Sequence, residues 1–164
     1  MPNLLKFLKA FRPQQPTPLP DPDAELALGA LLVRVAKSDR DYQFEEISLI
    51  DRILARMYGH NAIEAAKVRA TCEKLQAAAP ETDTFAKLIR EATGNEERIA
   101  ALEALWEVVL ADGTADEVEV RILEDARKAI GLSEADSDEA RERVQARLDN
   151  PASAPAKVSR APRS

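Results

Sequence analysis

The sequence predicts an all-α protein of about seven helices, packed as antiparallel hairpins. Apolar residues recur with the 3.6-residue period of a helix from residue 23 to 149, and few β-branched runs interrupt them. Four of the five glycines fall where this periodicity stops or a turn is needed. Aromatic residues form only 4% of the chain, which fits a core of Leu, Ile, Val and Ala between closely spaced helices.

The first two helices are predicted from their capping residues. The first is expected over residues 21–37, with Asp21 as the N-cap and Pro22 in the first helical position. The second is expected from about Gln43 to Tyr58. It ends at Gly59, a residue that readily takes the left-handed conformation of a helix terminus.

The next two helices have clear stop signals. Asn61 is expected to cap the third helix, with Glu64 completing a capping box and Pro80 following the end. The fourth is a short helix over residues 83–93, which we expect to end at Gly94.

Three further helices complete the predicted domain. The fifth begins at Asn95, the sixth covers residues 116–130 and ends at Gly131, and the last runs from residue 133 or 137 to about 148. One side of the fifth helix is expected to face the core, through Ile99, Leu102, Leu105, Trp106 and Val109.

Two segments of different composition flank the helical body. Residues 13–22 (PQQPTPLPDP) form a proline-rich spacer, and residues 150–164 are small, basic and expected to be disordered. The predicted organisation is therefore residues 1–22, a helical domain over 23–149, and a tail over 150–164. Both flanks carry net positive charge, so the helical body is more acidic than the overall −6 indicates.

Composition excludes several functional classes. One cysteine and one histidine, Cys72 and His60, rule out disulfide scaffolds and structural zinc sites. We expect Cys72, Phe85 and Trp106 in the core, and His60 facing solvent or the last carbonyls of a helix. The acidic balance argues against nucleic acid as a partner, and no apolar run is long enough to span a bilayer. We expect a non-enzymatic protein. We also expect it in the cytoplasm, since a lone thiol fits a reducing compartment.

The helical body repeats weakly with an offset of about 75 residues. In each copy, one helix is followed by an acidic loop and then by a second helix. That second helix contains Glu46 in the first copy and Glu119 in the second. The matched positions are Ala27, Ala30, Val33 and Ala36 against Leu102, Leu105, Val108 and Ala111.

Residues 105–133 (LWEVVLADGTADEVEVRILEDARKAIGLS), in the second copy, contain Ala111-Asp112-Gly113 with Glu119 downstream. With this pattern the second copy resembles the tellurite-resistance TerB-like family. Residues 28–54 are similar to the first copy of the family, although Lys37 and Ser38 stand where the family usually has Asp-Gly. The resemblance covers residues 24–148 and implies an all-helical domain without catalysis. It also implies a role in metal (tellurite) or stress response, as a metal-ion sensor or a scaffold near membranes.

The acidic loop of the second copy is a candidate cation site. Asp112, Asp116, Glu117 and Glu119 supply the oxygen ligands that Ca²⁺, Mg²⁺ or Mn²⁺ prefers. The alternative is purely structural: Gly113 ends one helix, Asp116 caps the next, and the glutamates complement its dipole. A weaker second site is predicted in the first loop, beside the cation-repelling Lys37 and Arg40, at Asp39, Asp41, Glu45 and Glu46.

The N-terminal segment is short, amphipathic and basic. Lysines and an arginine separate five large apolar residues, Leu4, Leu5, Phe7, Leu8 and Phe11. Such a segment docks on a membrane surface or a partner protein, or else it folds back on its own domain or stays disordered. The second functional hypothesis is therefore a metal-free adaptor, tethered to an unidentified protein partner or a membrane through this segment.

Overall fold

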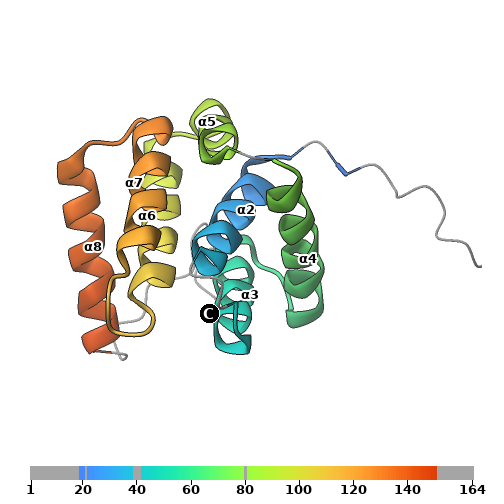
Figure 1. Cartoon of the computed structure of the whole chain (residues 1–164), viewed down its shortest axis with the longest axis horizontal. Coiled ribbons are helices and arrows are strands. Elements are labelled where there is room, and N and C mark those ends of the chain that lie inside the picture. The colour runs from blue at the N-terminus through green and yellow to red at the C-terminus, as the bar shows by residue number, and fades with distance from the viewer. Residues whose placement is uncertain (1–18, 21, 39–41, 80, 151–164) are drawn as a thin grey trace, which may run out of the picture.

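The computed structural model describes residues 19–20, 22–38, 42–79 and 81–150, and within these ranges it is all-α (Figure 1). Seven helices and no strand occur in this part of the chain, which confirms the predicted fold class. The helices are α2 (Ala24–Lys37), α3 (Phe44–Tyr58), α4 (Ala62–Ala78), α5 (Thr82–Ala92), α6 (Asn95–Leu110), α7 (Glu117–Ile130) and α8 (Glu134–Asp149). None of these helices is long and apolar enough to cross a membrane.

Helix α2 lies at the centre of the bundle, with α6, α7 and α8 on one side and α3 and α4 on the other (Figure 1). It packs against α3, α4, α5, α6 and α7. Apolar residues occupy nearly all its faces, and a helix of that kind is stable only when it is surrounded. The core of the domain is therefore built around α2.

The helix contacts follow the predicted internal repeat. Helix α2 packs on α3 and α4, and its counterpart α6 packs on α7 and α8. The contact of α2 with α7 is matched by the contact of α3 with α6, as a two-fold relation requires. Helix α5 has no counterpart and bridges the two units by packing on α2 and α7.

Most of the predicted caps are confirmed. Gly59 and Gly131 end α3 and α7 with φ of 71° and 91°, in the left-handed region that favours glycine. Asn61 and Glu64 form the predicted capping box at the start of α4. Of the two predicted starts for the last helix, the structure has Ser133 as the N-cap of α8.

Two predicted boundaries are wrong. Helix α2 begins at Ala24 and its N-cap is Asp23, whose Oδ1 accepts a hydrogen bond from the Leu26 N–H at 2.8 Å. Asp23 lies three residues before that N–H, which is the distance a capping side chain spans. Gly94 does not terminate α5, which ends at Ala92. The backbone of Gly94 is extended (φ −91°), and Gly94 is the N-cap of α6.

The predicted core residues are confirmed as buried, except Ile99, which is only partly buried. Phe85 and Trp106 are 2% and 3% exposed, and Cys72 is fully buried against α2. The contact between α2 and α4 is close enough to require a glycine, because a Cβ on Gly29 would lie 2.2 Å from Cys72 Sγ. Trp106 also donates a hydrogen bond from Nε1 to Ser137 Oγ at 3.0 Å, which joins α6 to α8.

Candidate functional site

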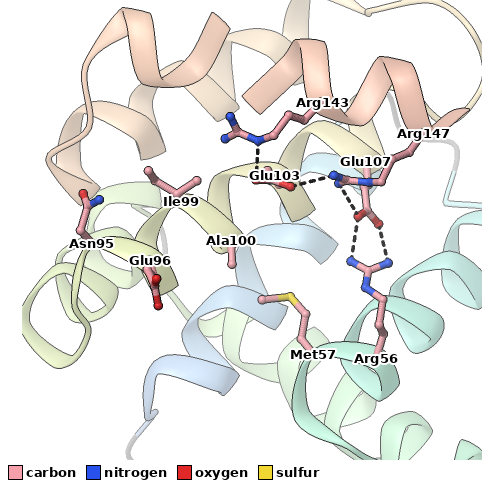
Figure 2. A pocket seen from close by; sticks show the side chains of 10 residues that line it. All are labelled: Arg56, Met57, Asn95, Glu96, Ile99, Ala100, Glu103, Glu107, Arg143 and Arg147. Carbon is pink, nitrogen blue, oxygen red and sulfur yellow. Dashed lines mark hydrogen bonds and ion pairs between the residues drawn. The ribbon is translucent and has the colours of Figure 1, made fainter. Parts of the chain in front are cut away.

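A pocket of about 500 Å³ opens between α3, α6 and α8 (Figure 2). One face of α6 forms its floor, α3 contributes one wall, and two arginines of α8 contribute the other. The lining residues are Arg56, Met57, Asn95, Glu96, Ile99, Ala100, Glu103, Glu107, Arg143 and Arg147. None of them is a serine, cysteine or histidine.

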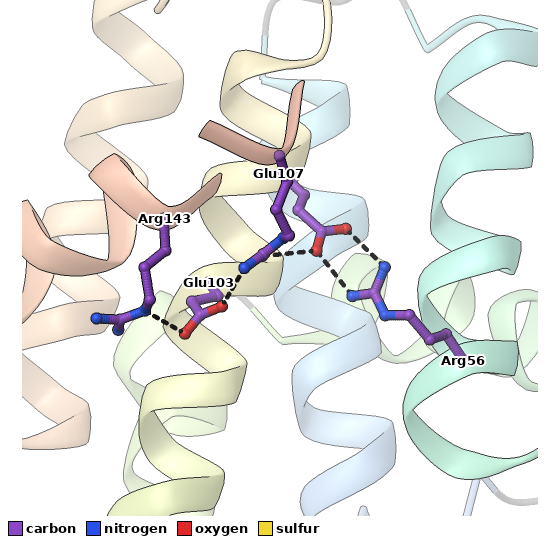
Figure 3. A network of polar contacts seen from close by, with 5 residues as sticks. Arg56, Glu103, Glu107 and Arg143 are labelled. Carbon is purple, nitrogen blue, oxygen red and sulfur yellow. Dashed lines mark hydrogen bonds and ion pairs between the residues drawn. The ribbon is translucent and has the colours of Figure 1, made fainter. Parts of the chain in front are cut away.

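Ion pairs cross one side of this pocket and join its three helices (Figure 3). Glu107 on α6 accepts hydrogen bonds from Arg56 Nη1 and Nη2 at 3.2 and 2.7 Å, the two-pronged geometry that arginine favours. The same carboxylate accepts from Arg147 Nη2 of α8 at 3.4 Å. Glu107 therefore connects α3 to α8 through α6.

A second glutamate extends the network along α6. Glu103 lies 3.0 Å from Arg147 Nη1 and 3.0 Å from Arg143 Nε. Residues four apart share a helix face, so Glu103 and Glu107 on α6 meet Arg143 and Arg147 on α8 as two matched pairs. We call these four residues and Arg56 the arginine–glutamate network.

The arginine–glutamate network is largely shielded from solvent. The side chain of Glu107 is 11% exposed and that of Arg147 is 16% exposed, whereas Arg143 at the rim is 44% exposed. Three arginines face two glutamates, so the network carries one surplus positive charge. Both carboxylates are occupied by arginine, which suits them to structure and recognition rather than to acid–base chemistry.

A second pocket of about 480 Å³ adjoins the first and shares Met57, Glu96 and Ala100 with it. It lies between α2, α3, α5 and α6. We call the two pockets together the α6 groove. The second pocket adds Ala24, Leu28, Tyr58, Ile89, Thr93, Glu97 and Ala101.

The second pocket is apolar inside and acidic at its rim. Leu28, Ile89 and Ala101 are buried, while Glu96 and Glu97 are exposed. Burial, followed by the charge of nearby carboxylates, raises the pKa of Tyr58, so this phenol stays a neutral donor.

The acidic loop before α7 is built mainly as a helix start. Asp116 Oδ1 accepts from the backbone N–H groups of Val118 and Glu119 at 2.8 and 3.3 Å, which confirms its predicted capping role. Asp112 Oδ1 accepts from the Thr114 N–H at 3.2 Å. Asp112, Asp116 and Glu117 are exposed, whereas Glu119 is 5% exposed.

The cation sites therefore stay predictions. Among the described residues, no group of three or more histidine, cysteine, aspartate or glutamate side chains is placed to hold a metal ion. In the first loop, Asp39 and Asp41 lie outside the described residues. Glu45 is exposed in the first turn of α3, and Glu46 completes a capping box with Gln43. The N-terminal residues Leu4, Leu5, Phe7, Leu8 and Phe11 also lie outside the described residues.

Comparison with known families identifies the fold. A family model described as "Tellurite resistance protein TerB" matches residues 25–142, well over half of the chain. The chain belongs to the TerB tellurite resistance family. No curated protein and no solved structure matches it.

The TerB match includes only part of the arginine–glutamate network. Arg56, Glu103 and Glu107 fall inside the matched residues, but Arg143 and Arg147 lie just beyond position 142. The TerB match also spans most of the α6 groove, beginning one residue after Ala24. Apart from Ala24, the part of the groove lining that the family model does not cover is therefore the α8 wall.

Two polar contacts of this TerB-family chain were not foreseen in the sequence. His60, expected to face solvent or helix carbonyls, is partly buried and lies with Nε2 2.5 Å from Glu25 Oε2, which ties the α3–α4 corner to α2. The carbonyls at the end of α4 accept hydrogen bonds from Arg34, which donates to Gln76 O at 2.7 Å and to Ala79 O. Each joins residues 35 or more positions apart, so no local pattern predicts them.

Proposed function

We propose that this TerB-family protein is a non-enzymatic adaptor that binds an amphipathic helix of a partner protein in the α6 groove. The observation that carries the proposal is the groove itself, which is apolar inside and charged at its edges. Amphipathic helices are recognised in this way, by apolar anchors that enter a groove and polar residues that pair at its rim. Membership of the tellurite resistance family supports a role of this adaptor in tellurite resistance.

The charges of the groove define the partner. Glu96 and Glu97 lie at the N-terminal end of α6, and the surplus arginine charge lies about three turns further along. A helix that fits carries basic residues at one end, acidic residues at the other and large apolar side chains between them. Such complementarity fixes the orientation of the partner more than it adds to affinity.

The divalent cation predicted at the acidic loop is not part of this proposal. Asp116 already has a structural role as the cap of α7, and carboxylates at helix N-termini are expected for that reason alone. The loop also lies outside the residues that line the α6 groove.

The proposal is tested by making the same changes at two alanines of the full chain, one inside the α6 groove and one outside it. Ala100 lines both pockets of the groove, and Ala70 is an exposed alanine on α4 that lines neither. A photo-crosslinking amino acid at Ala100 is expected to trap one partner in cells, while the same group at Ala70 does not. In cells lacking the protein, Ala100→Arg is expected to fail to restore tellurite tolerance and Ala70→Arg to restore it.

Two results would overturn the adaptor function. One is identical crosslinking from both positions. The other is full tolerance with Ala100→Arg, provided that thermal unfolding shows both variants folded.

A further inference from the structure

We propose that residues 4–11 of this chain occupy the α6 groove of the same molecule and exclude a partner helix from it. Docking of the segment stands on its own observations; only its competition with a partner rests on the proposed function. Three features of the chain support this docking: the position of the groove, the length of the preceding chain, and the charges of the segment and the groove.

The groove opens where the preceding chain meets the domain. Ala24 and Leu28, in the first two turns of α2, line its second pocket. The residues just before Ala24 therefore leave the domain at the groove. A segment upstream of them needs only to turn back to reach it.

The spacer between the segment and α2 has the length that this turn requires. A proline-rich chain extends about 3.1 Å per residue, so the ten residues 13–22 reach about 30 Å. The eleven residue steps along α6 from Glu96 to Glu107 span about 16 Å. A short tether of this kind gives an effective concentration on the order of millimolar, at which even a weakly binding segment is docked much of the time.

The chemistry of the segment matches that of the groove. Five large apolar residues alternate with Lys6, Lys9 and Arg12, and the apolar second pocket is rimmed by Glu96 and Glu97. The other glutamates of the groove are already paired with arginines, so the basic residues are attracted to this acidic end. A volume near 480 Å³ accommodates several leucine or phenylalanine side chains of the segment.

The chain contains a suitable reporter for this contact. It has two methionines, Met1 and Met57, and Met57 lines both pockets of the groove. In full-length protein labelled with ¹³C only in methionine methyl groups, Met57 reports directly on the occupant. Cys72 is buried, so a cysteine introduced by Asn3→Cys is the accessible thiol for a nitroxide spin label.

We expect the nitroxide at position 3 to remove most of the Met57 methyl signal. The same label introduced by Ser159→Cys, in the C-terminal tail, is expected to leave that signal unchanged. Adding Leu8→Asp to the position-3 protein is expected to restore it. Leu19→Asp, a matched change at an exposed residue in the described part of the spacer, is expected to leave the signal suppressed.

Other outcomes overturn the proposal. Loss of the Met57 signal from ¹³C-labelled chains that carry no nitroxide, when they are mixed with nitroxide-labelled chains that carry no ¹³C label, would mean that the segment docks on a second copy. No loss of signal, together with co-sedimentation on phosphatidylserine vesicles that Leu8→Asp abolishes, would assign the segment to membranes. All these measurements use the purified chain, so they succeed or fail independently of the crosslinking test for a partner.

Discussion

Replacing Glu107 by glutamine removes the charge that links α3 to α8 through α6. The glutamate accepts two hydrogen bonds from Arg56 and one from Arg147, and its side chain is 11% exposed. Exposed ion pairs contribute about 0.2–1 kcal/mol, and breaking a buried pair costs about 3–5 kcal/mol. This network lies between those limits, so we expect Glu107→Gln to lower the free energy of unfolding by about 2 kcal/mol. For a chain of this size the melting temperature then falls by about 4–8 °C.

Urea unfolding followed by circular dichroism measures this loss. The matched control is Asp83→Asn, which removes an exposed pair with Lys87 in which the two side chains are 43% and 65% exposed. The control is expected to lose less than about 0.5 kcal/mol. A double-mutant cycle of Glu107→Gln with Arg56→Gln isolates the pair itself, and we expect a coupling of about 1 kcal/mol that persists in 1 M salt.

The reasoning fails if Glu107→Gln is no more destabilising than Asp83→Asn. It also fails if the coupling between Arg56 and Glu107 is within error of zero. Either result would mean that the partial burial of the network does not strengthen it.

Further predictions concern packing, ionisation and capping. Gly29→Ala is expected to lower the free energy of unfolding, measured in urea, by about 2 kcal/mol, because the added Cβ meets Cys72 Sγ. In a Cys72→Ala background the same change is expected to lower it clearly less. An equal loss in both backgrounds would refute the contact. Burial raises the pKa of Cys72 to about 12, so the thiol ionises at a lower pH in the unfolded chain than in the folded one. The free energy of unfolding of the wild type therefore falls as the pH rises above 9. Between pH 9 and 11, Cys72→Ala is expected to show a smaller fall than the wild type. Asp116→Ala is expected to lose about 1 kcal/mol as a missing cap, equally in EDTA and in millimolar Ca²⁺, whereas a larger loss in Ca²⁺ would support the cation site. Hydrogen bonds from Ser133 lower the pKa of Asp136, which stabilises the folded protein when this carboxylate is charged. At pH 7, Asp136→Asn is therefore expected to be less stable than the wild type. The difference in the free energy of unfolding is expected to disappear as the pH falls below the pKa of the folded carboxyl.

The fold was predictable because its signals are local. A glycine such as Gly59 ends a helix through its own backbone freedom, and Asn61 caps one through an atom three residues from its target. The start of α2 was misplaced because Asp21 and Asp23 are equally suitable caps by residue type. Only the conformation around Pro22 decides between them, and the sequence leaves that open.

The candidate site was not predictable in the same way. Arg56 and Glu107 are 51 residues apart, and Arg147 is 40 residues from Glu107, so their contact depends on how three helices pack. One signal was available: glutamates four apart on α6 and arginines four apart on α8 give two helices with complementary charged faces. That pattern indicates a pairing but does not name the partner helix.

The central position of α2 affects how the protein is made. Helix α2 is complete by Lys37, but α7, one of the helices that cover it, ends only at Ile130. At about 5–20 residues per second, a ribosome needs roughly 5–20 s to synthesise the intervening chain. During that interval the leucines and valines of α2 lack part of their native cover. A chain that ends before α7 therefore lacks part of the surface that covers α2, and its exposed apolar residues favour aggregation.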